Sequence, residues 1–264
     1  MGVAVLCDIH GNLPALEAVI QELGTDEPDA VVIGGDVAAG PMPLEVLGRL
    51  RELPWPVLWL RGNADRALVM SYDGTVPEQW RDHPIWIADA WTATQISHAD
   101  RDFLDALPPL LRACVPGVGD VLFCHGTPES DEERVTVFTP ESRLEQILAG
   151  TGAAVVVAGH THRQFDRVAG GRRMLNAGSV GRPYEPEPGA YWLQLGPEAR
   201  LRCTPYDAAA ATAAFRRLGY PSADTMLAPV DADAVAARYE AASGEPTAPE
   251  SRTGFSAAVE PESP

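Results

Sequence analysis

Three short apolar runs alternate with two amphipathic runs at the start of the chain, and this order restricts the fold more than any other feature. Residues 3–7, 30–37 and 56–65 are typical of strands, the last with its exit loop. Residues 13–23 and 43–53 carry apolar side chains at helical spacing. Alternating strands and helices need right-handed crossover connections, so the sheet is predicted to begin with parallel strands. The fold class is therefore α/β.

Residues 66–100 interrupt this alternation. They hold three of the six tryptophans and show little periodicity. We expect a partly helical insertion over one edge of the sheet, which serves either as a covering helix pair or as a substrate cap, and we favour the covering role. The elements predicted next are a helix at 100–107, a strand pair within 110–126, a helix at 142–150 and a strand at 153–160.

The second half of the chain changes to short strands suited to antiparallel pairing. Four such runs follow residue 164, in two pairs that are each separated by a glycine-containing turn. Two helices, at 207–219 and 231–242, close the fold. Residues 243–264 are rich in Pro, Ser and Glu, which predicts a disordered acidic tail. The expected organisation is one domain over residues 1–242, followed by this tail.

Composition limits the kinds of partner. The 264 residues carry a net charge of −17, so most of the surface repels a polyanion and duplex nucleic acid is not an expected partner. A metal centre would still provide a local positive site for a small phosphate. No apolar run is long enough to span a membrane, and the N-terminus lacks the basic segment of a signal peptide. With four cysteines outside CxxC spacing, the chain is expected to be cytoplasmic and to have no membrane partner.

Polar residues follow the predicted strands at the points where these end. Asp8 and His10 follow the first strand, and His160 and His162 end the run at 153–160. Side chains two positions apart on an extended segment point to the same side, so each pair can converge on an ion. Four of the six histidines lie in such segments: His10, His125, His160 and His162. Any one segment is also explained as a turn that contains an imidazole, but their recurrence favours a metal site.

Taken in order, these segments resemble the motif set of the calcineurin-like metallophosphoesterase superfamily. The motifs are Asp8-x-His10, Gly35-Asp36 with Gly40, Gly62-Asn63-x-Asp65, His125-Gly126, Gly159-His160-Thr161-His162 and Asn176-Ala177-Gly178-Ser179. The resemblance spans residues 3 to 195. It implies a four-layer α/β/β/α sandwich, with two mixed sheets flanked by helices and a two-metal centre at the loop ends of the sheets.

The resemblance also implies a ligand set, carried over residue by residue. The first metal would be held by Asp8, His10, Asp36 and His162. The second would be held by Asp36, Asn63, His125 and His160, with Asp36 as the bridge. Asp36, Asn63 and His125 would support catalysis by a metal-bridging hydroxide. Carboxylate and imidazole ligands suit two divalent ions from among Mn, Fe, Ni and Zn.

The chain departs from the family pattern at Ala64, where many members have a histidine that assists the leaving group. The form Gly-Asn-x-Asp resembles a prokaryotic phosphodiesterase-like branch that also lacks this histidine. Asp65 or His98 could replace it as a proton donor. We favour the alternatives, in which Asp65 makes a structural hydrogen bond beneath the Asn63 loop and His98 begins a helix.

Three further residues are candidates for supporting roles. Asn12 is expected either to orient substrate phosphate or to fix its turn. Arg61 is a candidate for binding phosphate, although arginines at a sheet edge usually lie in solvent. Asn176 is expected to support the Gly159–His162 loop by hydrogen bonds, because metal ligands need partners behind them.

The predicted function is hydrolysis of phosphate esters, with small phosphodiesters favoured over other substrates. The alternatives are a phosphomonoesterase, including a protein-phosphatase-like activity, and a non-catalytic metal-binding scaffold. Filled ligand positions favour an enzyme, whereas Ala64 favours the scaffold. No residue identified in the sequence fixes the substrate.

Overall fold

The first sheet is built from both ends of the chain. The computed structural model describes residues 2–242, so the predicted tail lies outside the described residues. The strands of the first sheet are β1 (Val3–Leu6), β2 (Ala30–Gly34), β3 (Val57–Leu60), β9 (Ala190–Leu195) and β10 (Arg200–Thr204). Their order is β10-β9-β1-β2-β3. β1, β2 and β3 are parallel, as the opening alternation predicts, and β9 and β10 are antiparallel additions.

The second sheet comes from the middle of the chain. Its strands are β4 (Leu110–Val115), β5 (Gly119–Cys124), β6 (Val155–Ala158), β7 (Phe165–Ala169) and β8 (Arg172–Asn176), in the order β4-β5-β6-β8-β7. β4 and β5 form the predicted hairpin, with Val115 opposite Gly119. β5, β6 and β8 are parallel neighbours, so their carboxyl ends share one edge.

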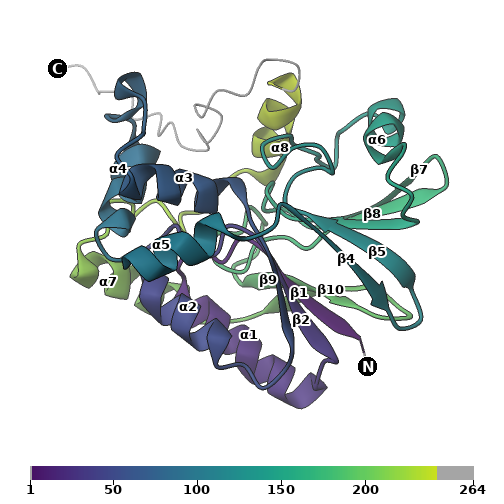
Figure 1. Ribbon diagram of the computed structural model, residues 1–264, viewed down its shortest axis with the longest axis horizontal. Helices are drawn as coiled ribbons and strands as arrows, with labels where there is room; N and C mark the ends of the chain where they lie inside the picture. Colours follow the sequence, from purple (N-terminus) through teal and green to yellow (C-terminus); the bar gives the residue numbers. More distant parts are fainter. Residues whose placement is uncertain (1, 243–264) are drawn as a thin grey trace.

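Helices cover the outer faces of both sheets (Figure 1). They are α1 (Leu13–Asp26), α2 (Pro43–Arg51), α3 (Asn63–Tyr72), α4 (Pro84–Ala93), α5 (His98–Asp105), α6 (Glu141–Leu148), α7 (Ala208–Leu218) and α8 (Ala232–Ala241), with a short 3-10 helix at Glu78–Trp80. None of the helices in residues 2–242 has the length and apolar character needed to cross a membrane.

Three apolar layers hold the sandwich together. Leu16 and Leu47 pack with the outer face of the first sheet, and Phe123 lies in the layer between the sheets. Leu144 of α6 packs with Met174 on the outer face of the second sheet. Side chains of successive strand residues point to opposite faces, so each strand contributes to two of these layers. The structure therefore confirms the predicted α/β/β/α sandwich with two mixed sheets.

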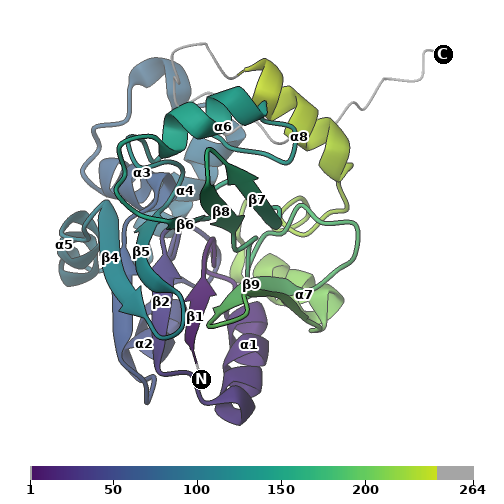
Figure 2. The same cartoon turned by 90° about the vertical axis from the view of Figure 1, so that its right-hand side faces the viewer.

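The arrangement of the two sheets fixes where polar motifs meet. The carboxyl ends of parallel strands lie at one edge of a sheet, and in open α/β folds that edge is where sites form. Figure 2 shows α6 and α8 at the end of the molecule opposite the start of β1, beyond these strand ends. The backbones of the two sheets join there, because Val180 donates a hydrogen bond to the carbonyl of Cys7 (3.0 Å).

The third motif differs from its prediction as part of an exit loop. Asn63 and Asp65 lie in the first turn of α3, with Gly62 as the residue before the helix. The Asp65 carboxylate accepts a hydrogen bond from the Gly62 amide (2.9 Å), which is the ordinary way to satisfy a free amide at a helix start. A short-range capping contact therefore replaces the loop that the strand pattern suggested.

Candidate metal centre

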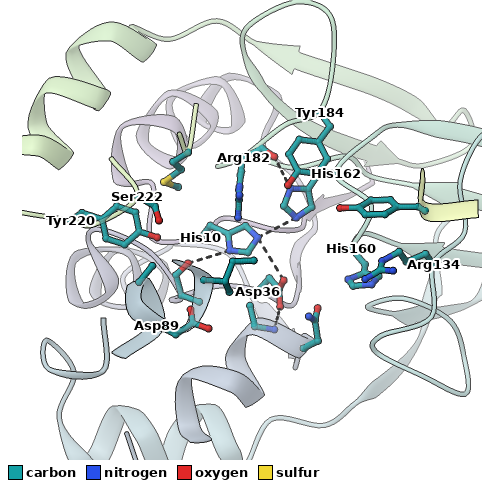
Figure 3. Close-up of a pocket in the computed structure, with 17 residues that line it drawn as sticks. His10, Asp36, Asp89, Arg134, His160, His162, Arg182, Tyr184, Tyr220 and Ser222 are labelled. Atoms are coloured by element: carbon teal, nitrogen blue, oxygen red, sulfur yellow. Dashed lines mark hydrogen bonds and ion pairs between the residues drawn. The ribbon is translucent and has the colours of Figure 1, made fainter. Parts of the chain in front are cut away.

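Four predicted ligands of the first metal form one buried cluster. Asp8 and His10 follow β1, Asp36 follows β2, and His162 follows β6. One ligand atom from each of the four lies within 4.8 Å of all the others. The Nε2 atoms of His10 and His162 are 3.2 Å apart. Figure 3 shows these two imidazoles facing each other above Asp36. Strand ends far apart in the sequence therefore bring these donors to one point.

The Asp8 carboxylate supplies the strongest structural indication of a cation. Its Oδ1 is buried, and no residue within 2–242 donates a hydrogen bond to it. This oxygen lies 3.2 Å from Nε2 of His162, 3.8 Å from Nε2 of His125 and 3.9 Å from Nε2 of His10. A buried carboxylate oxygen without a donor is costly, and a metal ion held jointly with the imidazoles would remove that cost. The residues present therefore fit a divalent cation.

The predicted second set lies directly beside the first. Nε2 of His125 is 3.0 Å from Oδ1 of Asn63 and 3.4 Å from Oδ2 of Asp36. The same Asp36 oxygen is 3.6 Å from Nε2 of His10, so it lies between the two sets. The His160 ring lies 5.1 Å from the His125 ring, centroid to centroid. This placement suits the bridging role that the resemblance implies for Asp36.

Each of the four histidines directs one ring nitrogen to a backbone carbonyl. Such a contact fixes the ring and leaves the other nitrogen for a metal, as in most protein metal sites. The pairs are His10 Nδ1 with Ala39 (3.2 Å), His125 Nδ1 with Gly34 (2.9 Å), His160 Nε2 with Glu132 (3.0 Å) and His162 Nδ1 with Arg182 (2.6 Å). The nitrogens that do not face these carbonyls are therefore Nε2 in three histidines and Nδ1 in His160.

Backbone strain is concentrated at the same residues. Six non-glycine residues of the described chain have a positive φ angle, and five of them are predicted ligands: Asp8, His10, Asp36, His160 and His162. The sixth, Glu27, ends helix α1. A left-handed conformation is uncommon outside glycine, although Asp and His adopt it more readily than most residues, and such residues often cluster at functional sites.

The balance of burial and nearby carboxylates shifts the pKa values of His10 and His125 in opposite directions. Burial lowers the pKa of His10 to about 3, against the opposing effect of the Asp36 carboxylate, so this ring is neutral and able to bind a metal. For His125, burial also acts to lower the pKa, but Asp36 and Asp8 outweigh it and raise the value to about 10. The carboxylates therefore attract positive charge to the position where a metal ion would lie.

A cavity lies over the cluster, with about 720 Å³ of empty space that includes open solvent. Part of its lining consists of predicted ligands, including His10, Asp36, Asn63, His160 and His162. The remainder includes side chains that the sequence did not single out: Asp89, Arg134, Arg182, Tyr184, Tyr220 and Tyr239. Arg182 and Tyr184 follow the Asn-Ala-Gly-Ser motif in the sequence, and Arg134 follows the His-Gly motif. This proximity was the only sequence signal for these three residues.

Comparison with known proteins agrees with this geometry. A model of the calcineurin-like phosphoesterase superfamily domain matches residues 1–195. The chain belongs to this superfamily. It is 27% identical over 179 residues to an uncharacterized protein of Methanocaldococcus jannaschii, covering 67% of this chain and 69% of that protein. A symmetrical bis(5'-nucleosyl)-tetraphosphatase of Baumannia cicadellinicola is 36% identical over 80 residues, covering 30% of this chain and 28% of that protein.

Solved structures of similar fold include two close in overall shape. A hypothetical protein from Pyrococcus horikoshii gives a TM-score of 0.73 at 22% identity, covering 83% of this chain and 94% of that one. A metallophosphoesterase from Sphaerobacter thermophilus gives a TM-score of 0.67 at 23% identity, covering 91% of this chain and 99% of that one. At these identities the likeness establishes the fold.

Among the calcineurin-like motif residues, Asp65 has a clear structural role. It is fully buried, and its carboxylate accepts hydrogen bonds from the amides of Asp36 (2.8 Å) and Val37 (2.9 Å), besides that of Gly62. Burial, together with the Asp36 charge, raises the pKa of Asp65 to about 6, whereas these amides act to lower it. Asp65 thus ties α3 to the loop that carries Asp36, which favours the structural alternative over a proton donor.

Asn176 makes the contacts that the sequence predicts for it. Its amide nitrogen donates to the Gly159 carbonyl (2.6 Å) and lies 3.0 Å from Oγ1 of Thr161, while its oxygen accepts from the Gly178 amide (2.9 Å). These bonds hold the segment from Gly159 to His162 against the end of β8. The orientation of both histidines in that segment therefore depends on Asn176.

Asn12 and Arg61 are not part of the cavity lining found in the described residues. Asn12 is fully buried; its oxygen caps α1 through the Ala15 amide (3.1 Å), and its nitrogen donates to the Gly181 carbonyl (2.9 Å). Arg61 reaches the carbonyl of Asp105 on α5 (3.3 Å). Asn12 therefore fixes its turn, in agreement with one of the two expectations for it, and Arg61 joins β3 to α5; their contacts with phosphate stay predictions.

Ala64 occupies the position of the absent histidine, and His98 does not lie near enough to line the cavity in its place. Ala64 lines the cavity, and its amide donates a hydrogen bond to Oδ1 of Asp36 (2.6 Å). His98 is exposed on α5 and lies 3.5 Å from the Asp102 carboxylate. The backbone at position 64 therefore orients the Asp36 carboxylate, while its side chain carries no acid or base.

Proposed function

We propose that this protein is a dinuclear metal-dependent phosphoesterase that hydrolyses small phosphodiesters. The observation that carries the proposal is the buried cluster of Asp8, His10, Asp36 and His162, with Asn63 and His125 beside it, under one cavity. Two divalent ions bound there would supply an activated water and would offset the negative charge of the phosphate. Membership of the phosphoesterase superfamily supports this chemistry.

The chain's own residues would hold and orient the reacting groups. The amide of Ala64 fixes one Asp36 oxygen and leaves Oδ2 directed toward His10 and His125. The backbone carbonyls behind the histidines keep each ring in a single orientation. Such prior organisation is what makes charge stabilisation in an active site effective, because little rearrangement is needed during reaction.

The cavity supports small substrates over protein substrates. Its walls come from α4, from the segments that carry Arg134 and Tyr184, and from the C-terminal part with Tyr220 and Tyr239. Walls from three parts of the chain make a concave site, which is the kind of site that binds small molecules. We prefer diesters with good leaving groups because position 64 is an alanine, and general acid assistance is worth about 10²–10⁴-fold in typical enzymes.

Turnover of two aryl esters tests this proposal. The purified protein, loaded with Mn²⁺, is expected to hydrolyse bis-p-nitrophenyl phosphate with a higher kcat/KM than p-nitrophenyl phosphate. His125→Ala and Asn63→Ala are each expected to lose about 10²-fold or more, since each removes a ligand of the proposed centre. His98→Ala, which removes an imidazole outside the cavity, is the matched control and should retain full activity.

Two results would contradict the proposal in different ways. Faster turnover of the monoester would identify the protein as a phosphomonoesterase instead of a phosphodiesterase. Full metal occupancy without turnover of either ester would favour a metal-binding scaffold.

A further inference from the structure

The part of the cavity that faces the metal cluster has its own chemical character. Two arginines, Arg134 and Arg182, and three tyrosines, Tyr184, Tyr220 and Tyr239, line it. Tyr220 and Tyr239 come after residue 195, where the match to the superfamily domain ends. The chain therefore adds residues of its own to the site beyond those of the shared domain.

The two arginines lie on different sides of the cluster. Figure 3 shows Arg182 beside His10 and His162, and Arg134 beside His160. Arg134 is buried, with its guanidinium 4.6 Å from the centre of the Tyr239 ring. The Arg182 guanidinium lies 6.0 Å from the Tyr184 ring centre. Cation–π contacts of this kind hold an arginine in place, and its planar, always charged guanidinium suits recognition of an anion.

The same backbone segments position the arginines and the metal-site histidines. His162 contacts the carbonyl of Arg182 itself, and His160 contacts the carbonyl of Glu132, two residues before Arg134. The distance from each guanidinium to the cluster is therefore set by the fold. A substrate that spans from the cluster to an arginine would meet a preformed geometry.

Formal charges indicate what kind of substrate the cavity accepts. Two divalent cations would bring four positive charges against the carboxylates of Asp8 and Asp36. Arg134 and Arg182 add two positive charges, and Asp89 adds one negative charge. With the buried carboxylate of Asp65 counted as well, the sum is two positive charges, of which one phosphodiester anion would offset one. Excess charge in a buried site is unfavourable, so a second anionic group on the substrate would be stabilised there.

We propose that Arg134 and Arg182, with the tyrosine wall, form a second anion subsite that selects phosphate esters carrying an additional negatively charged group on an aromatic or nucleoside scaffold. The inference rests on the proposed phosphoesterase function and names its substrate class. The rings of Tyr184, Tyr220 and Tyr239, together with Ile85 and Met226, supply flat and apolar surface for the scaffold. The arginines supply planar donors for the second anion.

A matched pair of substrates tests the subsite. Thymidine 5'-(p-nitrophenyl phosphate) and its 3'-phosphorylated form share the scissile bond and the leaving group, and differ by one phosphate. With the Mn²⁺-loaded protein, the 3'-phosphorylated form is expected to have a kcat/KM about tenfold or more higher, because charge-assisted hydrogen bonds are the strong ones. Equal values would overturn the subsite while leaving the phosphoesterase proposal intact.

Binding measured without turnover separates the two proposals. Thymidine 3',5'-bisphosphate is expected to bind about tenfold or more tightly than thymidine 5'-monophosphate in calorimetry. Arg134→Gln and Arg182→Gln should each reduce this ratio, whereas Arg216→Gln, which removes an exposed charge paired with Asp224, should keep it. A wild-type ratio near one, or a ratio retained in both cavity variants, would overturn the subsite. A retained binding preference without hydrolysis of any ester would contradict the phosphoesterase function alone.

Discussion

Individual residues in the centre serve two purposes at once. Each histidine uses one ring nitrogen for a backbone carbonyl and keeps the other for the cluster. Five predicted ligands hold positive φ angles, which cost on the order of 1–3 kcal/mol each where they are strained. These positions are therefore poor choices for stability alone, and their clustering is explained by a requirement to converge on ions.

Asp65 provides a test at the level of one residue. Asp65→Asn keeps the shape but replaces an acceptor oxygen by a donor that faces the amides of Asp36, Val37 and Gly62. We expect a loss of about 1–3 kcal/mol in the free energy of unfolding, measured by urea denaturation, and weaker metal binding. Asp120→Asn, at an exposed site, is the control and should change little.

The opposite pattern would change the role of Asp65. Wild-type stability and metal content, combined with a large loss of kcat, would identify Asp65 as the proton donor that the sequence left open.

At the scale of elements, the sequence predicts the features that are determined by residues close together in the chain. Strand ends, the parallel start of the first sheet and the β4–β5 hairpin follow from local patterns, and all three are present. The start of α3 at Asn63 was missed because a glycine and a capping carboxylate decide it, against the strand pattern before it. The contacts of Asn12 with Gly181 and of Arg61 with Asp105 could not be predicted, because these partners are distant in the sequence.

The close approach of β1 and β6 gives a prediction at this scale. A Cβ atom at Gly159 would lie 2.4 Å from Oδ2 of Asp8 and 2.6 Å from Cβ of Cys7. Gly159→Ala is therefore expected to displace Asp8 and to reduce metal content, measured by elemental analysis after Mn²⁺ loading. Gly48→Ala, in α2 with open space around it, should bind metal normally and be stabilised by about 0.5–1 kcal/mol. Unchanged metal content in Gly159→Ala would show that Asp8 is not a ligand.

At the scale of the whole molecule, the cavity joins parts of the chain that no local pattern connects. α4, the Arg134 segment and the residues from Tyr220 to Tyr239 meet above the cluster. The sequence could not predict this wall, since tyrosines and arginines in loops and helices carry no spacing signal. The residues of 66–100 that line the cavity, Ile85, Ala88 and Asp89, support a substrate-facing role for α4 as well as its packing on α3. With the proposed ions bound, the cavity would be a positive site within an acidic chain.

Removal of metal should affect the stability of the entire molecule. A ligand present at 100 times its Kd stabilises the folded state by about 2.7 kcal/mol. For a domain of this size each kcal/mol shifts Tm by about 2–4 °C, so EDTA is expected to lower the Tm of the Mn²⁺-loaded protein by about 5–10 °C. Asp36→Asn, which removes the bridging carboxylate, should show little response to EDTA. A wild-type Tm that EDTA leaves unchanged would argue against metal bound within the fold.

The position of the metal ions tests the central claim most directly. Anomalous diffraction from crystals grown with Mn²⁺ locates each ion without reference to activity. The account predicts two peaks within bonding distance of Asp36, one also contacting Asp8, His10 and His162, and the other also contacting Asn63, His125 and His160. A single peak, or peaks away from these side chains, would contradict a two-metal centre built from the ends of the strands.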